Sequence, residues 1–462
     1  MLGIHEVLRD SVFRRIFLLS VLIKFGFLYF LPSSPSALAP DEGAYSQITL
    51  WFSDGKDLSN PATMGMGLYE SSRSLIIPAG ILCKLGVPSL YAVRITSVIY
   101  GLLSILIFMT LILNFTILKT SFKPKRILLL RLFTVLVFIF LPSHFLWSEL
   151  GLRESASEFW ILLSAFLLLK IYVSLEKINF YYYALLTVSL VLAFGSRKQT
   201  AMVFIFAIFL AQVLTRINKK TFMIFGSLFL AGALGFLFVS TPAIEVTKIY
   251  HLEPINPLVN YAASAKSCFK SDQIVKVGQD EFICKLQKKI VKKYIFSKVI
   301  AQIPSSDLDN LQTQFELNRA NAESALPESK CSQQRDSNLD LYLCLAKELP
   351  YRAGSFLFRP LFPFDSGSYT YNLASFENYF WLSLTILLLL SLYQLIRQLN
   401  YRYELNFVYI YIVGFIVGSA IYEGNLGTAF RHKSSMLWCL LLISYVCIQN
   451  LYASKVSNTG RK

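Results

Sequence analysis

The chain has 462 residues, of which 55% are hydrophobic and only 16% are charged. A soluble protein carries about 25% charged residues, so the composition excludes an ordinary soluble enzyme. The formal net charge of +16 would suggest a nucleic-acid partner for a soluble protein. In a hydrophobic chain the same residues serve to orient membrane segments, and we therefore expect no nucleic acid among its partners.

Apolar runs recur along most of the chain, and a membrane-spanning helix takes about 20 such residues. Arg9, Arg14 and Arg15 precede the first run, so we expect a cytoplasmic N-terminus that is not a cleavable signal. Placing the later runs alternately across the bilayer predicts about ten spans with both termini cytoplasmic. The predicted spans lie at about 16–31, 92–117, a segment ending near 146, 159–175, 180–194, a segment ending at 216, 221–240, 377–396, a segment ending at 422, and 435–452.

These spans predict an all-α polytopic membrane protein in three parts. Residues 1–240 form an N-terminal transmembrane module, residues 241–376 a mainly helical external domain inserted late in the chain, and residues 377–462 the C-terminal transmembrane helices. The first external loop, 32–73, precedes an apolar stretch at 75–87 that is short for a span. We interpret this stretch as an interfacial or re-entrant helix, with a tilted half-span as the alternative.

The predicted external domain contains four of the seven cysteines. An even number in an external segment indicates disulfides, and pairing Cys268 with Cys284 and Cys331 with Cys344 is the simplest of the possible connectivities. The segment 283–295 is basic and amphipathic, typical of a helix on an anionic membrane surface or of one packed on its own domain.

No Asn-x-Ser/Thr acceptor for glycosylation occurs in the predicted external domain, which favours a bacterial setting.

Two adjacent carboxylates, Asp41 and Glu42, follow the first predicted span. Their simplest explanation is the acidic first turn of a helix. The chemical alternative is a general base, which removes the proton from an acceptor hydroxyl in the transition state. Asp41 is our candidate for this base, with Glu42 as its neighbour or substitute.

Several cations in short loops lie on the same predicted side as these acids, although cations are expected on the cytoplasmic side. An ordinary ion pair inside the bundle could account for each of them, for instance Arg153 with Glu149 or Glu154. Together they predict an anion site, because clustered cations favour phosphate. The residues concerned are Arg153, the pair Arg197 and Lys198, the run Arg431, His432 and Lys433, and, as weaker additions, Arg73 and Arg94.

In these features the chain resembles the GT-C superfamily of integral membrane glycosyltransferases, which use polyprenyl-phosphate-linked sugars. The likeness rests on Pro40, Asp41 and Glu42 after the first span, on the multi-span bundle and on the large external domain. It implies an inverting transferase with Asp41 as base and external arginines and lysines on the lipid phosphate. The acceptor would be a glycolipid, polysaccharide or protein, and we expect a bacterial inner membrane with the site facing the periplasm. Many relatives place their soluble domain after the last span, whereas here further spans follow, which leaves the sugar and acceptor open.

Other functions remain open at this point. The late loop with Arg431, His432 and Lys433 is similar to that of O-antigen polymerases, which join preassembled repeat units. A transporter or flippase for a lipid-linked sugar would place charges near mid-membrane in broken helices, often with internal repeats. We find no convincing repeat, and the charges cluster at one face, which favours chemistry at a surface. A non-enzymatic assembly or sensor protein would leave these charges without a common role.

The carboxylate pair could also hold Mg²⁺ or Mn²⁺. No second acidic cluster has to join it, although Glu149, Glu154 or Glu423 could do so. We therefore expect chemistry without a metal and no other cofactor. Zinc is less expected still, because the cysteine spacings are long and the nearest histidine to them, His251, stands alone.

Overall fold

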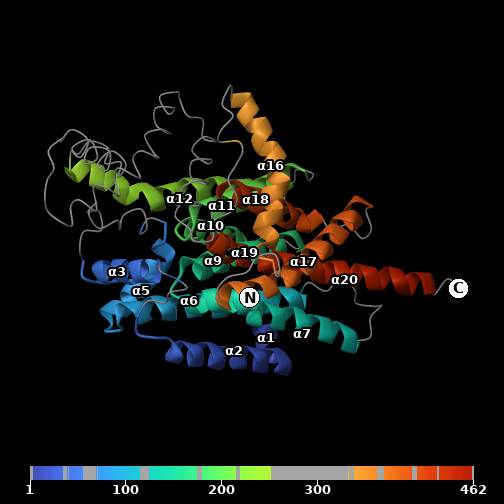
Figure 1. Cartoon of the computed structure of the whole chain (residues 1–462), viewed down its shortest axis with the longest axis horizontal. Coiled ribbons are helices and arrows are strands. Elements are labelled where there is room, and N and C mark those ends of the chain that lie inside the picture. The colour runs from blue at the N-terminus through green and yellow to red at the C-terminus, as the bar shows by residue number, and fades with distance from the viewer. Residues whose placement is uncertain are drawn as a thin grey trace.

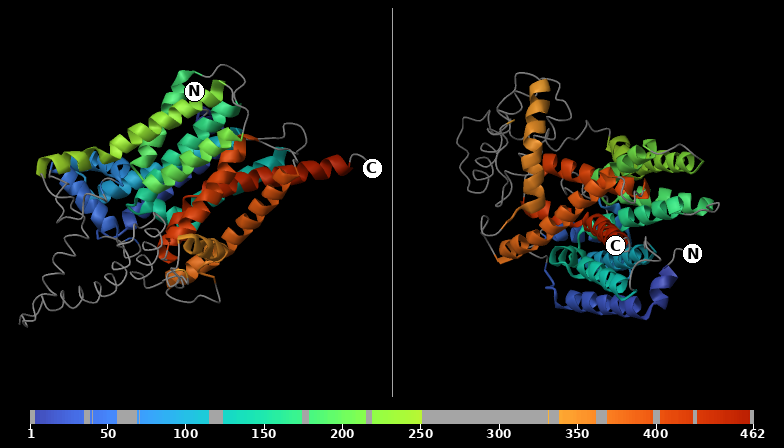
Figure 2. Two further views of the ribbon diagram at one scale, coloured as in Figure 1. Left: turned by 90° about the horizontal axis from the view of Figure 1, so that it is seen from above. Right: turned by 90° about the vertical axis from the view of Figure 1, so that its right-hand side faces the viewer.

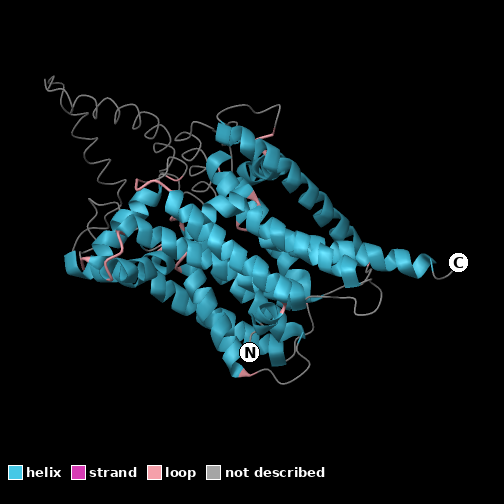
Figure 3. Ribbon diagram, turned by 90° about the horizontal axis from the view of Figure 1, so that it is seen from below, coloured by secondary structure: helices cyan, strands magenta, loops and turns pink. Residues whose placement is uncertain are grey.

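The structure, a computed structural model, consists of helices joined by loops, with no strand among the residues that it describes (Figure 3). The described residues are 4–34, 39, 41–55, 69, 71–114, 124–173, 179–214, 219–250, 331, 338–361, 369–397, 403–423 and 426–459. Three features predicted from the sequence lie outside these residues: most of the external domain 241–376, its segment 283–295, and the pair Cys268 and Cys284.

Figure 1 shows the arrangement of the described helices. In chain order they are α1 (Ile4–Arg9), α2 (Ser11–Phe30), α3 (Asp41–Ser53), α5 (Arg73–Lys84), α6 (Ser89–Asn114), α7 (Pro124–Phe140), α8 (Pro142–Glu149), α9 (Arg153–Val173), α10 (Phe180–Phe194), α11 (Lys198–Val213), α12 (Lys219–Tyr250), α16 (Asn338–Phe358), α17 (Tyr369–Ile396), the 3₁₀ helix η4 (Tyr403–Leu405), α18 (Asn406–Tyr422), α19 (Leu426–Ser434) and α20 (Leu437–Thr459).

A helix lies at each predicted span, but only some of these helices are long and apolar enough to cross a membrane. In the described part of the chain three qualify by length and composition: Ser89–Asn114, Arg153–Val173 and Ala374–Ile396. The number rises to five if each of two bent pairs is one span, α7 with α8 at 49° and α19 with α20 at 53°. The prediction of about ten spans is therefore not confirmed, whereas the all-helical class is.

The remaining helices explain why fewer helices qualify as spans than the sequence predicted. Four apolar helices, Phe180–Phe194, Lys198–Val213, Lys220–Gly235 and Asn406–Ile421, have only 10–17 residues, fewer than the about 20 that a span requires. Helix α2 has 20 residues but carries Arg14, Arg15 and Lys24.

Helices α6 and α9 form the centre of the bundle. Helix α6 packs against α3, α5, α8 and α9, and α9 packs in turn against α10. Aromatic rings fill these contacts: Phe108 of α6 stacks on Phe138 of α7 with ring centroids 4.3 Å apart, and Tyr100 lies 5.4 Å from Phe159 of α9. Large buried rings stabilise such contacts beyond their area alone. The beginning of α9, which carries the candidate residue Arg153, is therefore held on a well-packed core.

Helix α5 is the short apolar stretch that the sequence predicted as interfacial or re-entrant. It lies against α3 and α6, and Pro78 falls inside it. Ser74 ties it to the turn between α10 and α11, because its backbone N–H donates to Gly195 O at 3.1 Å and its hydroxyl donates to Leu192 O at 2.6 Å. Tyr100 adds a hydrogen bond from its hydroxyl to Ser74 O at 2.7 Å. These bonds fix α5 beside the beginning of α11.

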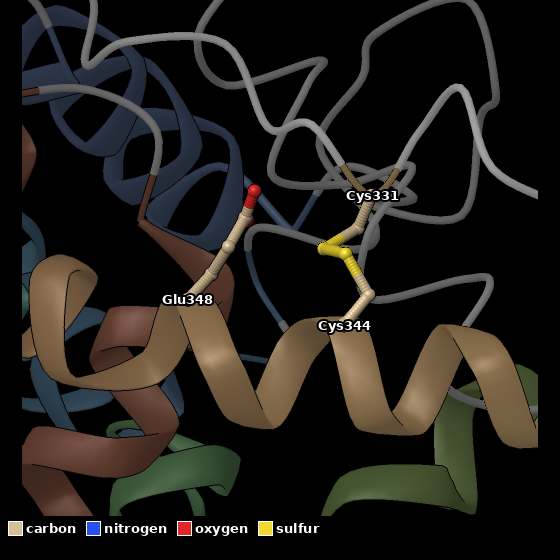
Figure 4. Close-up of side chains that lie close together, drawn as sticks. All are labelled: Cys331, Cys344 and Glu348. Carbon is tan, nitrogen blue, oxygen red and sulfur yellow. A yellow bond between two sulfur atoms is a disulfide. The ribbon is translucent and has the colours of Figure 1, made fainter.

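Helix α16 runs across the direction of the other helices, as Figures 1 and 2 show. It packs against α17, α18 and α19. Cys344 near its beginning forms a disulfide with Cys331, and Glu348 lies one turn further along (Figure 4). Because the two sulfur atoms are bonded to each other, Cys331 and Cys344 do not offer thiolate ligands to a metal.

Candidate active site

A cavity of about 320 Å³ lies where the beginnings of α9 and α11 meet the end of α18 and the helix α19. Four of the residues predicted for the anion site line it: Arg153, Arg197, Arg431 and His432. They come from three separate parts of the sequence, and the sequence had grouped them only by membrane side. The structure brings them into one site.

Arg431 connects this cavity to Asp41. Its Nη1 donates to Asp41 Oδ2 at 2.8 Å, and its Nε lies 3.1 Å from Glu154 Oε1. The Asp41 side chain is 45% exposed, whereas those of Arg431 and Glu154 are 14% and 4% exposed. Asp41 is therefore accessible from solvent at the first turn of α3, and Arg431 separates it from the cavity. The pair of Arg431 with Glu154 is the more buried of the two, so solvent screens it less than the pair with Asp41.

A second group of contacts surrounds His432. Arg197 Nη2 lies 2.8 Å from His432 Nδ1 and 3.7 Å from Glu423 Oε1. Glu423 Oε1 is also hydrogen-bonded to His432 Nδ1. A ring nitrogen carries either one lone pair or one proton, so the tautomer of His432 decides whether Nδ1 accepts from Arg197 or donates to Glu423. His432 Nε2 lies 3.7 Å from Glu154 Oε1, which joins this group to Arg431.

The surroundings of Glu423 also shift its ionisation. Burial raises the pKa of Glu423 to about 7, against the opposing effect of nearby Arg197 and Arg431. The carboxyl group therefore changes its charge near neutral pH while its arginine neighbours stay charged. The net charge of the cavity thus depends on this residue.

Arg153 and Tyr45 complete the surroundings. Arg153 Nη1 donates to Ser71 Oγ at 2.7 Å, so the residues before α5 are attached to the beginning of α9. Tyr45 lies one turn after Asp41 in α3 and is 2% exposed. Burial raises the pKa of the Tyr45 hydroxyl, while Arg153 acts in the opposite direction. A neutral phenol beside these charges can donate a hydrogen bond.

Glu42 points away from the cavity, although it adjoins Asp41. Its two carboxylate oxygens accept from Arg94 at 2.7 and 2.9 Å, and Oε1 also accepts from the backbone N–H of Gly151 at 2.9 Å. Arg94 in turn donates to Pro32 O and Ser34 O. Glu42 and Arg94 are fully buried. They hold the first loop, α6 and the turn before α9 together, which is a structural arrangement and not an accessible base.

The other predicted cations lie elsewhere. Lys433 is fully buried and donates to Leu357 O at 3.2 Å and to Asn378 Oδ1, facing α16 and α17. Arg73 is buried, with its guanidinium 5.0 Å from the ring centroid of Tyr69. Lys198 begins α11 but is not among the residues that line the cavity.

The structure also contains buried polar pairs that the sequence analysis did not predict. Lys24 of α2 donates to Glu149 at 2.8 Å, and His144 of α8 lies 2.9 Å from Glu158 of α9. Glu377 of α17 accepts from the backbone N–H of Ser143 at 2.8 Å and so caps the beginning of α8. These pairs could have been predicted from a charged residue inside an apolar run, because an unpaired charge there costs free energy.

Arginine or histidine side chains contact each of the three carboxylates at the site, Asp41, Glu154 and Glu423. Arginine holds Asp41 and Glu154, and histidine and arginine contact Glu423. Arginines around the cavity oppose a divalent cation and favour an anion. In the described part of the chain, the one group of three possible metal ligands is the disulfide pair with Glu348. The arrangement thus fits chemistry on a phosphate.

No family model matches this sequence, and no match is found among the curated proteins with which it was compared.

Proposed function

We propose that the protein is a membrane glycosyltransferase that moves a sugar from a polyprenyl-phosphate carrier to an acceptor hydroxyl. The observation that carries this proposal is the position of Arg431, which contacts the solvent-accessible Asp41 on one side and lines the cavity on the other. An acceptor can reach Asp41 from solvent, and a donor phosphate fits among Arg153, Arg197 and Arg431. The reacting sugar would then lie between base and phosphate.

The chemistry follows from these positions. Asp41 takes the proton of the acceptor hydroxyl as its oxygen attacks the anomeric carbon of the sugar. The bond from that carbon to the phosphate oxygen breaks, and the carrier leaves as polyprenyl phosphate with one more negative charge. Arg197 and Arg431 stabilise that developing charge. Attack opposite the leaving group inverts the anomeric configuration.

The beginning of α11 adds to the same effect. This helix has 16 residues, and its N-cap residue, Arg197, makes no side-chain capping hydrogen bond. Gln199 and Thr200 of its first turn line the cavity. Uncapped N–H groups at the positive end of a helix dipole favour an anion. Together with Arg197 they support a phosphate at this point.

The proposal also specifies the membrane, the side that the site faces and the class of acceptor. The site would face the exterior of a bacterial inner membrane, with a glycolipid, polysaccharide or protein as acceptor. A polymerase that joins preassembled glycan units makes and breaks the same kinds of bond but differs both in the glycan that is transferred and in the acceptor. Divalent Mg²⁺ or Mn²⁺ has no required role in these steps.

The test uses the full chain reconstituted in liposomes with a polyprenyl-phosphate sugar and a short glycan acceptor. Asp41→Asn is expected to remove transfer, measured as release of polyprenyl phosphate, while the protein remains folded by its thermal unfolding profile. Asp54→Asn is the matched control, because Asp54 is an exposed carboxylate just after the end of the same helix. Wild-type turnover in Asp41→Asn would refute the assignment of the base.

One observation favours a second function, transport of the same lipid-linked sugar. The bent pairs α7–α8 and α19–α20 are the kind of discontinuous helix that transporters place at substrate sites. The same liposomes separate the two functions. Movement of the intact lipid-linked sugar between leaflets without cleavage supports a transporter, and release of polyprenyl phosphate supports the transferase.

A further inference from the structure

Helix α19 presents three consecutive side chains to three different surroundings. Arg431 contacts Asp41 and Glu154. His432 lines the cavity, and Lys433 faces α16 and α17. Successive residues of a helix point about 100° apart, so the rotation of α19 about its own axis sets all three directions together. The contacts that hold Lys433 therefore also determine where Arg431 points.

The neighbouring helices do not fix the orientation of α19. It has nine residues, fewer than the about 12–15 that an isolated helix needs to be stable in water. Helix α18 ends at Tyr422, and its C-cap residue, Glu423, is extended. Helix α20 follows α19 at an angle of 53°. The axis of α19 thus continues into neither neighbour, and its side-chain contacts must fix its rotation.

Lys433 makes contacts that join α19 to two other helices. It is fully buried, and its Nζ donates to Leu357 O of α16 at 3.2 Å and to Asn378 Oδ1 of α17. Asn378 is also fully buried, and its Nδ2 donates to Pro360 O, two residues after the end of α16. These hydrogen bonds connect α16, α17 and α19 in one closed set.

The buried ammonium of Lys433 is costly for stability alone. Both of its oxygen acceptors are uncharged, and the rings of Phe430 and Trp381 lie 4.7 and 5.5 Å from Nζ. Glu377, on the same turn of α17, accepts from Ser143 and Trp381 instead. A buried cation loses its hydration, which neutral contacts repay only in part. A methionine of similar length would avoid this cost, so the lysine indicates a role other than stability.

The same turn of α17 also holds α8. Glu377 accepts from the backbone N–H of Ser143 at 2.8 Å, and α8 packs against α19. Helix α8 leads through a short turn to Arg153 at the beginning of α9. Residues Glu377 and Asn378 are thus hydrogen-bonded to both short helices next to the cavity.

We propose that Lys433 is a positioning residue for the sugar transfer, because its bonds to Leu357 and Asn378 fix the rotation of α19 that brings Arg431 to Asp41. Side chains reach about 6 Å from a helix axis, so a rotation of about 20° would move the Arg431 guanidinium by about 2 Å. That displacement would separate it from Asp41. Lys433 acts through Arg431 and contacts neither donor nor acceptor. The inference deepens the proposed function, on which the role in transfer rests.

The experiment compares three substitutions in the full chain reconstituted in liposomes. Lys433→Met removes the ammonium and keeps the length of the side chain, and Asn378→Leu removes its acceptor in α17. Gln394→Leu is the matched control, because Gln394 is a buried amide of α17 about four turns further along that accepts from Asn450 of α20 at 3.4 Å. Release of polyprenyl phosphate gives kcat and the KM for the donor, and thermal unfolding gives the stability.

We expect Lys433→Met and Asn378→Leu to lower kcat by about 10²-fold, the loss that a misplacement of about 1 Å causes. The KM for the donor is expected to change less, because Arg153 and Arg197 still line the cavity. Gln394→Leu is expected to keep the wild-type kcat although it unfolds no later than Lys433→Met. A wild-type kcat in Lys433→Met would overturn the inference.

A double substitution separates positioning from a general loss of packing. If Lys433 acts through Arg431, Lys433→Met has little further effect once Arg431 has been replaced by lysine. We expect Lys433→Met to change the kcat of the Arg431→Lys protein by less than about twofold. A second loss of about 10²-fold in the double variant would overturn the inference.

Hydrogen exchange provides a readout that does not require sugar transfer. Loss of the contact between Arg431 and Asp41 is expected to raise amide exchange in α19 and α3 in Lys433→Met but not in Gln394→Leu. That pattern in a protein that transfers no sugar would refute the transferase and leave the role of Lys433 in orienting α19 intact. Transfer at the wild-type rate with unchanged exchange in Lys433→Met would leave the transferase intact and overturn the inference.

Discussion

Arg431 Nη1 donates to Asp41 Oδ2 at 2.8 Å, a contact between residues separated by 390 positions in the chain. Arg431 also lies 3.1 Å from Glu154. One guanidinium therefore fixes the first turn of α3 to the beginning of α9 and places its charge at the cavity. This double contact needs a planar group with several donors, which lysine does not have.

Replacement of Arg431 by lysine tests that geometry. Arg431→Lys keeps the positive charge but cannot hold Asp41 and Glu154 together. We expect the transfer rate to fall by about 10²-fold, the magnitude seen when one donor to a developing oxyanion is removed. Kinetics of polyprenyl phosphate release at saturating donor measure the effect.

Arg397→Lys is the matched control, because it makes the same arginine-to-lysine substitution at an exposed residue just after the end of α17. It is expected to leave the rate unchanged. An Arg431→Lys enzyme as fast as wild type would show that only the charge matters at this position.

The charge state of Glu423 predicts how phosphate binding depends on pH. Burial raises the pKa of Glu423 to about 7, so the carboxyl group is neutral below that pH and negative above it. The extra negative charge beside Arg197 opposes a phosphate. The affinity for dodecyl phosphate, measured by native mass spectrometry of the full chain in nanodiscs, is thus expected to fall as the pH rises through about 7, and Glu423→Gln is expected to flatten the profile. A profile that Glu423→Gln leaves unaltered would exclude Glu423 as its source.

The same shift predicts an effect on stability with a definite sign. The folded pKa of Glu423 lies above the ordinary value of 4.5, so the folded protein binds more protons than the unfolded one between these values. Its contribution to the free energy of unfolding is present at low pH and is lost as the pH rises through about 7. Glu423→Gln should therefore reduce the decline in the apparent Tm between weakly acidic and neutral pH.

The adjacent carboxylates Asp41 and Glu42 are predicted to respond differently to the same change. Glu42→Gln leaves Arg94 buried without its partner, which typically costs about 3–5 kcal/mol. Asp41→Asn removes a partly exposed carboxylate and is expected to change stability much less. Thermal unfolding of both variants in the same detergent measures this contrast. A more stable Glu42→Gln than Asp41→Asn would contradict the structural role assigned to Glu42.

This contrast also shows how far the sequence could go. The rule that cations collect on the cytoplasmic side singled out Arg153, Arg197 and Arg431, and the structure brings these three to one cavity. Knowing the membrane side of a residue places it at one end of the bundle. It does not tell which way the side chain points around the helix axis. Neighbours on a helix point about 100° apart, which is why Glu42 faces Arg94 while Asp41 faces Arg431.

The predicted number of spans is not confirmed, for a related reason. Hydropathy locates apolar helices, and each predicted span does coincide with one. Hydropathy does not decide whether a helix crosses the bilayer or ends within it, and the bent pairs α7–α8 and α19–α20 fit either a broken span or a re-entrant loop. Glu377 caps the beginning of α8 across 234 positions of sequence, and a contact at that separation is set by packing alone.

The turn before α9 provides the last prediction. Gly151 donates its N–H to Glu42, and a Cβ atom on Gly151 would lie 2.7 Å from Val93 Cγ1. Valine is stiff at χ1, so the clash must shift the turn and with it Arg153. Gly151→Ala is therefore expected to cost about 1–3 kcal/mol and to raise the KM for the donor more than it lowers kcat. Gly226→Ala, where the added methyl meets nothing within 4 Å, should change neither. An unchanged KM in a destabilised Gly151→Ala protein would separate this turn from the phosphate site.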